Sequence, residues 1–378
     1  MKVGLLTSHS SMNIGGLLQA YCLKRQIMEL GYECDIVPYV PTHHDLKKHP
    51  IKYIFQRKRW LTRSFFVITH FRSFRKRSKL FKSFKKAYLV VDEQACDYSS
   101  LPLRIREYKC VCVGSDQLWN LNKKDNDNGA YYLNFKHDDL NVFSYAVSFG
   151  DGLLKCPEKI QGMLPCLDSF LRISVRDEKS QEFLSNNGHQ STLCLDPTLL
   201  PDRAFWDQFP KNKGKHDYIL IYGFENAYQN YRDLVSVALK ISKETGLPVF
   251  NAIMDEKLTK NGFVERFDVG PVEFLGLLRG ASYVITNSFH GTIFSIVNKV
   301  PFFVVADSEK GLDGRKETLL RQTNLMDRVL TNNSDVSRIL DSKVDFDASW
   351  NLLKPLRESS IDYLRNCLME AFKSHEQH

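Results

Sequence analysis

The chain has 378 residues, of which 43% are apolar and 25% are charged, and its formal net charge is +8. This composition is typical of a globular protein and excludes a disordered or fibrous chain. One hydrophobic core rarely serves more than about 300 residues, so we expect two domains.

Two absences bear on where the protein works. The apolar run at the N-terminus, residues 1–7, is too short for a signal peptide. No later stretch approaches the roughly 18 uninterrupted apolar residues that a membrane-spanning helix requires. We therefore expect a cytoplasmic protein whose contact with the inner face of the membrane, if it has one, is peripheral.

Cysteine usage argues against both disulfides and metal ions. The nine cysteines are scattered, without a CxxC pair or the ligand spacing of a zinc site. A cysteine of this kind usually behaves as a small buried hydrophobe. We expect reduced, mostly buried thiols and no metal site.

The first 200 residues alternate between short apolar strands and helical segments. A strand over residues 2–7 leads through a polar loop to a helix that begins near Leu17 and ends at Gly31. A strand at 34–39 then completes a βαβ unit. Further strands are expected at 110–113, 141–147, 172–175 and 193–198, with a helix at 178–186.

A strongly basic segment interrupts this alternation. No acidic residue occurs between Asp45 and Asp92, whereas Lys and Arg recur from Lys47 to Lys86 among regularly spaced phenylalanines. We interpret the segment as a helical insertion over about residues 45–92. Three roles stay open for it: a solvated face, a surface for anionic lipid or a lipid-linked substrate, and a nucleic-acid site. No nucleic-acid motif accompanies it, so we do not expect nucleic acid as a partner.

The second half of the chain repeats the α/β pattern. A lysine-rich stretch at 211–215 separates the halves, and beyond it strands are expected at 218–222, 248–253, 283–286 and 301–305, with helices between them. We predict Rossmann-like domains over residues 1–212 and 213–345, and a helical segment over 346–378 that packs back on the first domain. Two such domains resemble the GT-B arrangement of many transferases, with a cleft between them.

The end of the first strand is the first candidate binding position. In open parallel sheets, ligands bind at the carboxyl ends of strands, where helix N-termini offer unpaired N–H groups. Asn13, Gly15 and Gly16 follow the first strand and let the backbone approach an anion. The segment is not GxGxxG, which argues against a nicotinamide or flavin site. A tight turn without a ligand is the alternative.

Polar side chains also follow the strand at 110–113. Ser115, Asp116 and Gln117 come directly after it, and Trp119 offers a stacking surface for a sugar. The alternative is a capped helix start, with Ser115 or Asp116 as the cap.

The next two strands also end in polar residues. Ser148 follows the strand at 141–147, and Arg176 follows a strand that looks buried. The planar guanidinium of arginine suits a carboxylate or a phosphate. A structural salt bridge from Arg176 to Asp177 or Asp196 is the alternative.

The strongest local signal lies at the end of the strand at 283–286. The strand delivers Ser288 and His290 to a helix N-terminus, Gly291 permits close approach by backbone, and Thr292 follows. Histidine is the side chain best suited to proton transfer near neutral pH. We therefore predict a binding and catalytic turn here, with a structural histidine as the alternative.

Taken together, four segments in this order resemble the polysaccharide pyruvyl transferase family: residues 13–21, 114–120, 174–177 and 288–292. The resemblance spans roughly residues 3–330. It implies a GT-B-like transferase that moves the pyruvyl unit of phosphoenolpyruvate onto a sugar, as a ketal bridging two hydroxyls. A galactose-type residue of a capsule or exopolysaccharide, free or lipid-linked, is the implied acceptor, and no cofactor is implied.

The resemblance also implies roles for individual residues. The first domain would be the acceptor side and the second the donor side. Arg176 and the His290 turn would bind and activate phosphoenolpyruvate, with His290 as the general acid. Asp116 would orient or deprotonate an acceptor hydroxyl.

One departure of the chain from the family matters. Relatives often carry Arg-Leu-His where this chain has Ser288-Phe289-His290. Arg315 and Lys316 are therefore the candidates for holding the phosphate, with a charged helix start as the alternative. Two other functions stay open: a glycosyltransferase with a nucleotide-sugar donor, and a binding protein without turnover.

Overall fold

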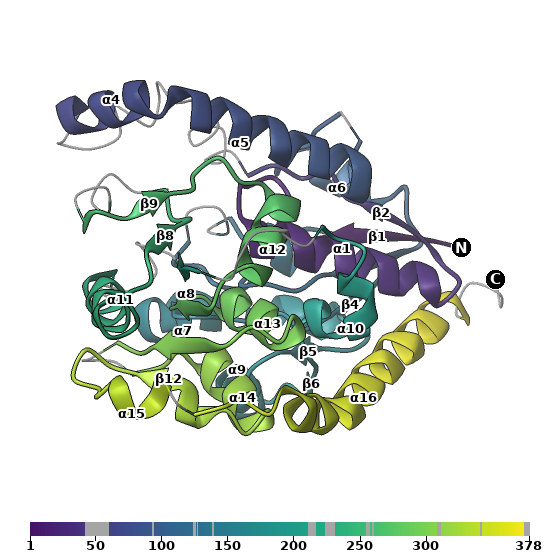
Figure 1. Ribbon diagram of the computed structural model, residues 1–378. Coiled ribbons are helices and arrows are strands. Elements are labelled where there is room, and N and C mark those ends of the chain that lie inside the picture. Colours follow the sequence, from purple (N-terminus) through teal and green to yellow (C-terminus); the bar gives the residue numbers. More distant parts are fainter. Residues whose placement is uncertain are drawn as a thin grey trace. The chain divides into compact units, whose positions relative to one another are not determined.

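The computed structural model describes residues 1–41, 60–92, 94–123, 126, 128–137, 140–210, 217–223, 231–254, 258, 261–307, 311–340 and 342–373 (Figure 1). The chain divides into two compact units. Unit 1 comprises Met1–Lys48, Ser83–Pro201 and Lys354–His378, and unit 2 comprises His49–Lys82 and Asp202–Leu353. The predicted class, α/β with parallel sheets, is confirmed. The division falls after Pro201 rather than after residue 212, and residues 49–82 of the basic insertion group with unit 2.

Unit 1 is built on a four-stranded parallel sheet in the order β2-β1-β3-β4. Its strands are β1 (Lys2–Leu6), β2 (Glu33–Ile36), β3 (Cys110–Val113) and β4 (Asn141–Ser144). All four residues of β3 are buried, as expected for a strand covered on both faces. Because β2 and β3 flank β1 on opposite sides, the sheet has its topological switch point between β1 and β3.

Helix α1 (Ile14–Glu29) links β1 to β2. The side chain of Asn13 caps its N-terminus by accepting a hydrogen bond from the Gly16 amide at 3.3 Å. Gly31, with φ +92°, ends the helix in the left-handed conformation that suits glycine. The helix thus begins three residues before Leu17, because the cap admits Ile14, Gly15 and Gly16 into its first turn.

Unit 1 also contains short helices, one longer helix and a second pair of strands. They are η2 (Lys85–Leu89), α6 (Leu101–Ile105), η3 (Ala130–Tyr132), α7 (Gly152–Lys155), α8 (Pro157–Met163), η4 (Leu164–Ser169), β5 (Ser174–Val175), α9 (Glu178–Asn186), β6 (Thr192–Leu193) and η5 (Pro197–Leu199). The predicted helix at 178–186 is confirmed at both ends, with Asp177 as its cap. Strands β5 and β6 pair in parallel as a separate two-stranded sheet.

Unit 2 contains a six-stranded parallel sheet in the order β12-β11-β10-β7-β8-β9. Its strands are β7 (Ile219–Tyr222), β8 (Val249–Asn251), β9 (Val264–Glu265), β10 (Tyr283–Thr286), β11 (Phe302–Val305) and β12 (Val329–Leu330). The chain leaves β7 toward β8 on one side and later adds β10 on the other. The switch point of this sheet therefore lies between β7 and β10.

Helices precede, connect and follow the strands of this sheet. They are α10 (Arg203–Trp206), α11 (Tyr231–Thr245), α12 (Pro271–Arg279), α13 (Phe289–Val297), α14 (Gly314–Gln322), η7 (Met326–Arg328) and α15 (Ser337–Leu340). The β7–β8 and β10–β11 crossovers run in opposite directions across the sheet, so their right-handedness places α11 and α13 on opposite faces. Burial on both faces explains why β7 and β11 consist almost entirely of apolar residues.

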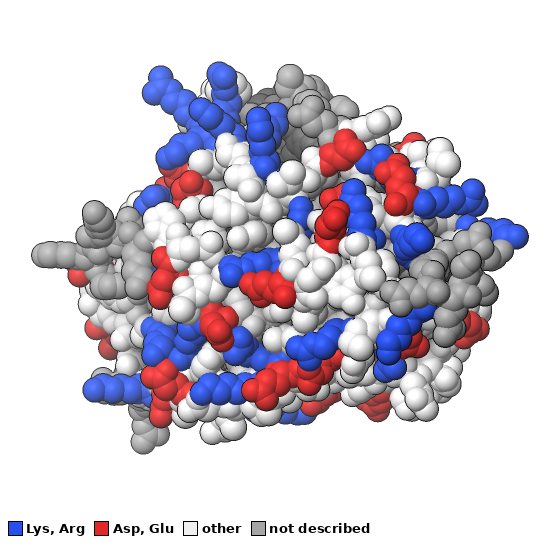
Figure 2. Space-filling view, turned by 90° about the vertical axis from the view of Figure 1, so that its right-hand side faces the viewer, with Lys and Arg blue, Asp and Glu red and all other residues white. Residues whose placement is uncertain are grey.

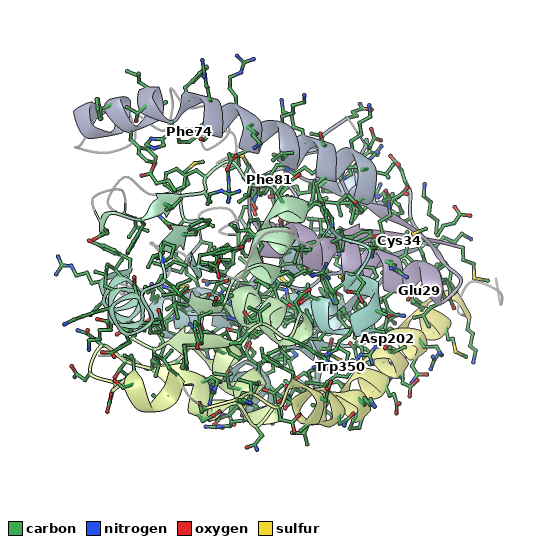
Figure 3. The ribbon with its side chains drawn as sticks, in the orientation of Figure 1. Glu29, Cys34, Phe74, Phe81, Asp202 and Trp350 are labelled. Atoms are coloured by element: carbon green, nitrogen blue, oxygen red, sulfur yellow. The ribbon has the colours of Figure 1, made fainter. Side chains whose placement is uncertain are left out.

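Helices α4 (Trp60–Thr69) and α5 (Phe71–Phe84) follow one another along the upper edge of Figure 1. Phe74 and Phe81 lie on the lower side of α5 in Figure 3, and Phe81 is fully buried. Phe66 lies with its ring centroid 5.7 Å from that of Phe267 in unit 2. Burial of this apolar stripe explains why the segment groups with unit 2. The part of the predicted insertion between residues 42 and 59 lies outside the described residues.

Helix α16 (Phe346–Lys373) ends the described chain. From Lys354 onward it belongs to unit 1, where the Tyr363 hydroxyl donates to the Ser144 carbonyl at 3.0 Å. The Ser360 hydroxyl accepts a hydrogen bond from the Leu195 amide at 3.0 Å. Among the helices of the described ranges, none is long and apolar enough to cross a membrane.

The nine cysteines all lie within the described residues, and seven of them are buried. Burial raises the pKa of the Cys34, Cys194 and Cys367 thiols to about 12. Because the thiolate is the reactive form, these thiols should resist an aromatic disulfide reagent at pH 8. We expect fast labelling only at the half-buried Cys156 and Cys166 in the native protein, and at all nine after denaturation. Peptide mass mapping would check this, and fast native labelling of Cys34 would contradict it.

Candidate active site

The Ser288 turn lies at the switch point of the unit 2 sheet. Strand β10 ends at Thr286, and the Ser288 hydroxyl caps α13 by accepting from the Gly291 amide at 3.3 Å. The Thr286 hydroxyl donates to the Tyr222 carbonyl at the end of β7, at 2.5 Å, and accepts from the Ser288 amide at 3.0 Å. These bonds tie the turn to the ends of both central strands, so its geometry is set by the sheet.

His290 is the second residue of α13, and only 4% of it is exposed. Its ring stacks on that of Phe294, with centroids 6.1 Å apart and planes 23° apart, and meets Phe289 edge-on at 5.4 Å. The aromatic contacts restrict the orientation of the imidazole. Its place in the first helical turn puts it beside the partial positive charge of the helix N-terminus.

A second helix N-terminus meets this turn. Asp313 caps α14 by accepting from the amides of Arg315 and Lys316. The Lys316 ammonium donates to the Asn287 carbonyl at 2.8 Å and pairs with Asp313 at 2.9 Å. The Arg315 guanidinium pairs with Asp313 at 3.1 Å and lies 5.6 Å from the centre of the Phe289 ring.

The structure therefore places Arg315 and Lys316 beside the Ser288 turn, although Lys316 and its partner Asn287 are 29 positions apart in sequence. Two cations share one carboxylate there, and two helix N-termini add partial positive charge. Such an arrangement suits an anion with several oxygens, such as a phosphate. The bond from Lys316 to the Asn287 carbonyl ties the charged start of α14 to the Ser288 turn.

Gly291 and Thr292 each have a structural role in this turn. A Cβ atom at Gly291 would lie 2.4 Å from the Thr286 hydroxyl oxygen and 3.0 Å from the Tyr222 ring. The glycine therefore lets α13 pack against the strand ends. Thr292 is fully buried, and its hydroxyl donates to the Ser288 carbonyl at 3.1 Å.

Gly291→Ala should destabilise the protein by about 1–3 kcal/mol, the usual cost of forcing an extra methyl into a filled core. Urea denaturation followed by circular dichroism would measure the change. Gly162→Ala is the matched control, because Gly162 lies inside α8 and a Cβ there meets nothing within 4 Å. That control should be neutral or stabilising. Equal effects of the two substitutions would contradict the packing explanation.

In unit 1 a buried ionic cluster lies at the carboxyl ends of β3 and β5. The Arg176 guanidinium pairs with Asp196 at 2.6 Å and with Asp116 at 3.0 Å. The Ser115 hydroxyl lies 3.3 Å from the Asp196 carboxylate and donates to the Ala146 carbonyl at 3.0 Å. The Arg176 and Asp196 side chains are wholly buried, whereas 11% of the Asp116 side chain is exposed. Asp116 is thus the charged member of the cluster that solvent reaches.

The backbone at this cluster is strained. Asp116 has φ +86° and Ala146 has φ +49°, in the left-handed region that non-glycine residues rarely adopt. The Asp116 carbonyl accepts from the Ser148 amide at 3.0 Å, which holds the two strand ends together. Strain of this kind costs on the order of 1–3 kcal/mol and tends to occur at functional sites.

The other candidates of unit 1 have defined places. Asn13, Gly15 and Gly16 form the capped start of α1, which follows β1 at the switch point of this sheet. The Gln117 side chain accepts from Asn120 at 3.2 Å. Trp119 requires a correction: its indole is fully buried and donates to the Tyr131 carbonyl at 3.0 Å, so it offers no stacking surface to a sugar.

Four residues that meet these candidates were not selected from the sequence as site residues: Gly223, Asn287, Asp313 and Asp196. A Cβ at Gly223 would lie 2.0 Å from the Asn287 side chain. The glycine therefore leaves space for Asn287 at the end of β7. Asp313 could have been found from the sequence, because an aspartate just before a helical segment often caps the helix N-terminus. Asp196 was considered only as a salt-bridge partner, which is the role the structure gives it.

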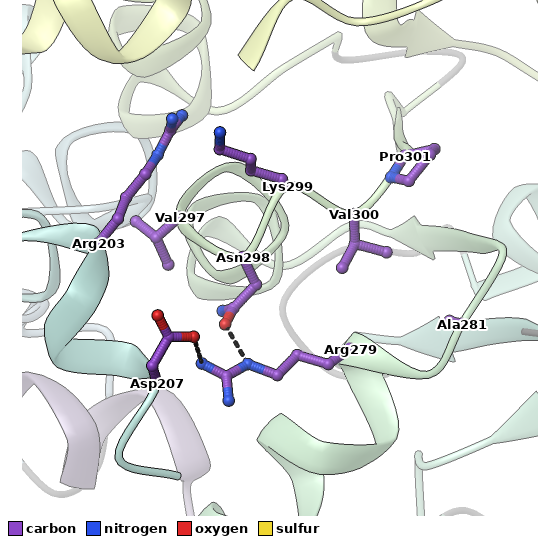
Figure 4. A pocket seen from close by; sticks show the side chains of 9 residues that line it. All are labelled: Arg203, Asp207, Arg279, Ala281, Val297, Asn298, Lys299, Val300 and Pro301. Carbon is purple, nitrogen blue, oxygen red and sulfur yellow. Dashed lines mark hydrogen bonds and ion pairs between the residues drawn. The ribbon is translucent and has the colours of Figure 1, made fainter. Parts of the chain in front are cut away.

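A cavity of about 450 Å³ lies elsewhere in unit 2 (Figure 4). Its lining includes Ala281 and Pro301, which precede β10 and β11, so it opens at the amino edge of the sheet. Arg279 crosses it to donate to Asn298 at 2.5 Å and to the Phe209 carbonyl at 2.6 Å. Ligands of parallel sheets bind at the opposite edge, where the His290 turn lies. We regard this cavity as a structural feature.

Comparison with known proteins supports a transferase of polysaccharide metabolism. The family model described as polysaccharide pyruvyl transferase matches residues 13–309. No curated protein sequence matches the chain. Among solved structures, the UDP-GlcNAc 2-epimerase of Neisseria meningitidis bound to UDP-GlcNAc is 11% identical, with a TM-score of 0.55, and the match covers 98% of this chain and 100% of that one.

The UDP-GlcNAc 2-epimerase of Methanocaldococcus jannaschii in complex with UDP-GlcNAc and UDP is 13% identical, with a TM-score of 0.52. That match covers 94% of this chain and 99% of that one. Both solved structures have the GT-B fold, which confirms the predicted fold class. At these identities the likeness shows the fold alone.

Proposed function

Because the chain belongs to the polysaccharide pyruvyl transferase family, we propose that it moves the pyruvyl group of phosphoenolpyruvate onto two hydroxyls of a sugar. The acceptor would be a galactose-type residue of a polysaccharide or of its lipid-linked precursor. The observation that supports the donor most directly is the meeting of the α13 and α14 N-termini, with Lys316 bonded to the Asn287 carbonyl at 2.8 Å.

In this proposal the donor binds to unit 2. The phosphate would take hydrogen bonds from Lys316, Arg315 and the helix N-termini, which replace the arginine that relatives carry at the Ser288 position. These donors would also stabilise the phosphate as it departs. The Asp313 carboxylate, shared by both cations, would hold them in place before the donor arrives.

His290 would act as the general acid. A proton delivered to the methylene carbon of phosphoenolpyruvate makes it a methyl group and leaves carbon 2 electrophilic. One sugar hydroxyl attacks carbon 2 and loses its proton. The carbon–oxygen bond to phosphate then breaks, the second hydroxyl attacks and loses its proton, and the products are the ketal and inorganic phosphate. Of the two protons lost by the sugar, one replaces that given by His290 and the other leaves with phosphate.

Within the ionic cluster of unit 1, we assign the contact with the acceptor to Asp116, whose side chain is partly exposed. Its carboxylate would accept a hydrogen bond from a sugar hydroxyl and help to remove the proton. The Arg176 side chain is wholly buried between two carboxylates. We therefore propose that Arg176 positions Asp116, in place of the phosphate-binding role that the family resemblance implied.

The donor assignment is tested by ligand binding and by turnover. Phosphoenolpyruvate at about 100 times its Kd should stabilise the protein by about 2.7 kcal/mol, and the melting temperature should rise accordingly. Lys316→Met should abolish that rise, whereas Arg321→Met, an exposed cation of the same helix, should leave it unchanged. Mass spectrometry should detect one pyruvyl ketal on a galactose-containing acceptor, together with phosphate release.

Two outcomes would contradict the proposal. Stabilisation by a nucleotide diphosphate or UDP-sugar, with none by phosphoenolpyruvate, would favour a glycosyltransferase. Stabilisation by phosphoenolpyruvate without phosphate release in the presence of any sugar acceptor would favour a binding protein.

A further inference from the structure

Helices α4 and α5 present two different sides. The inward side carries the aromatic stripe that packs on unit 2. Three polar contacts of the same side reinforce it: His70 with Glu265, Lys76 with Asp268 at 2.5 Å, and Arg77 with the Val269 carbonyl at 3.0 Å. The two helices are therefore held on unit 2 by side chains along much of their length, and their outward side has a defined orientation.

The outward side begins with exposed apolar side chains. Phe65 is 70% exposed, Ile68 is 73% exposed and Phe71 is 47% exposed. Phe65 and Ile68 are in α4, and Phe71 is the first residue of α5. Their spacing of three residues places them at neighbouring positions where the two helices meet. Single exposed apolar residues need no explanation, but three large ones together mark an interaction site.

The same outward side continues with basic residues. Arg72, Arg75, Lys79 and Lys82 are exposed and follow one another at helical spacing along α5. Neither helix contains an acidic residue that would neutralise them. Figure 2 shows Lys and Arg side chains projecting from the upper edge of the molecule, the level at which α5 lies in Figure 1. We call the outward residues from Phe65 to Lys82 the α4–α5 face.

We propose that the α4–α5 face binds the surface of a membrane that contains anionic phospholipids, with Phe65, Ile68 and Phe71 entering the interface. Basic residues provide attraction to the headgroups, and large apolar residues beside them provide the short-range anchor. Nucleic acid would use the charges but would leave the aliphatic side chain of Ile68 without a partner. This pairing of apolar and basic side chains therefore favours a bilayer. The proposal does not depend on which donor or acceptor the enzyme uses.

Vesicle co-sedimentation of the full chain tests the proposal. We expect the protein to sediment with vesicles of equal parts phosphatidylcholine and phosphatidylglycerol, and to stay in solution with phosphatidylcholine alone. Raising the salt concentration should weaken binding, because the Debye length falls below about 8 Å above physiological ionic strength.

Two variants separate the contributions of charge and apolar contact. Arg75→Glu with Lys79→Glu should weaken partitioning at least tenfold, since each basic residue near the surface contributes roughly a fivefold factor. Phe65→Ser with Ile68→Ser and Phe71→Ser should also weaken it, and the residual binding should be more sensitive to salt. The matched control is Arg232→Glu with Lys243→Glu, two exposed cations of α11, which should bind as the unchanged protein does.

Three results would overturn the proposal. One is equal binding, or none, to the two kinds of vesicle. Another is an equal loss in the α11 control, which would indicate an effect of net charge alone. The third is salt-sensitive binding to a DNA or RNA oligonucleotide that depends on Arg75 and Lys79 but not on Phe65, with no binding to anionic vesicles.

Discussion

His290→Ala is expected to lower turnover at least about a hundredfold, the lower range of what a positioned acid contributes. The imidazole lies in the first turn of α13, where it contacts the rings of Phe289 and Phe294. Without it, the methylene carbon of phosphoenolpyruvate would lack its proton donor. Initial rates of phosphate release with donor and acceptor present would measure the loss.

Controls distinguish a lost proton donor from a damaged helix. His290→Gln preserves more of the side-chain volume and should be as inactive as His290→Ala. Ser295→Ala removes a buried hydroxyl one turn further along α13, which donates to the Gly291 carbonyl at 2.9 Å, and should keep activity within a few fold. If the His290 variants fold and keep full activity, His290 is not the general acid. A loss in Ser295→Ala equal to that of the His290 variants would point to helix geometry instead.

Arg176→Met should produce the largest loss of stability, about 3–5 kcal/mol, because it leaves the Asp116 and Asp196 carboxylates buried without their counter-charge. This loss in the free energy of unfolding arises because two carboxylates lose their buried partner. It does not measure how much the intact ion pairs contribute to stability. Urea denaturation followed by circular dichroism would measure it. Asp196→Asn introduced into the Arg176→Met protein should recover part of the loss, because it removes one of the stranded charges.

The Arg172–Glu370 pair offers a matched comparison within unit 1. Its nitrogen and oxygen are also 2.6 Å apart, but both side chains are nearly half exposed. Arg172→Met should cost less than about 1 kcal/mol, as is usual for exposed pairs. If the two arginine substitutions had similar effects, burial would not be what makes the Arg176 cluster important.

The Ser288 turn of unit 2 and the Arg176 cluster of unit 1 both lie at the carboxyl ends of parallel strands. In each unit candidate residues follow strands that border the topological switch point: Asn13 and Ser115 follow β1 and β3 in unit 1, and Ser288 follows β10 in unit 2. Others come from neighbouring elements, since Arg176 follows β5 and Lys316 lies at the start of α14. At a switch point the adjacent connections turn to opposite faces of the sheet and leave the strand ends accessible. The fold therefore accounts for why polar residues far apart in sequence gather at these positions.

The local sequence pattern was enough to predict the α/β class, most of the strands and the position of the His290 turn. Buried parallel strands such as 110–113 and 283–286 are short apolar runs that end in polar residues, and helices such as 178–186 carry their own caps. These signals depend on neighbours in sequence, so they can be read without the fold. Element ends were less certain where a cap, such as Asn13, admits glycines into a helix.

Only the tertiary structure decided which of these residues are available for chemistry. It brought Lys316 to the Ser288 turn, buried Arg176 between two carboxylates, closed Trp119 inside the core and assigned Gly291 to packing. It also attached the basic helices to unit 2 and exposed Phe65, Ile68 and Phe71 beside their charges. Burial and ion pairing depend on residues that are distant in sequence, so residue type and local spacing determined the candidates while packing determined their roles.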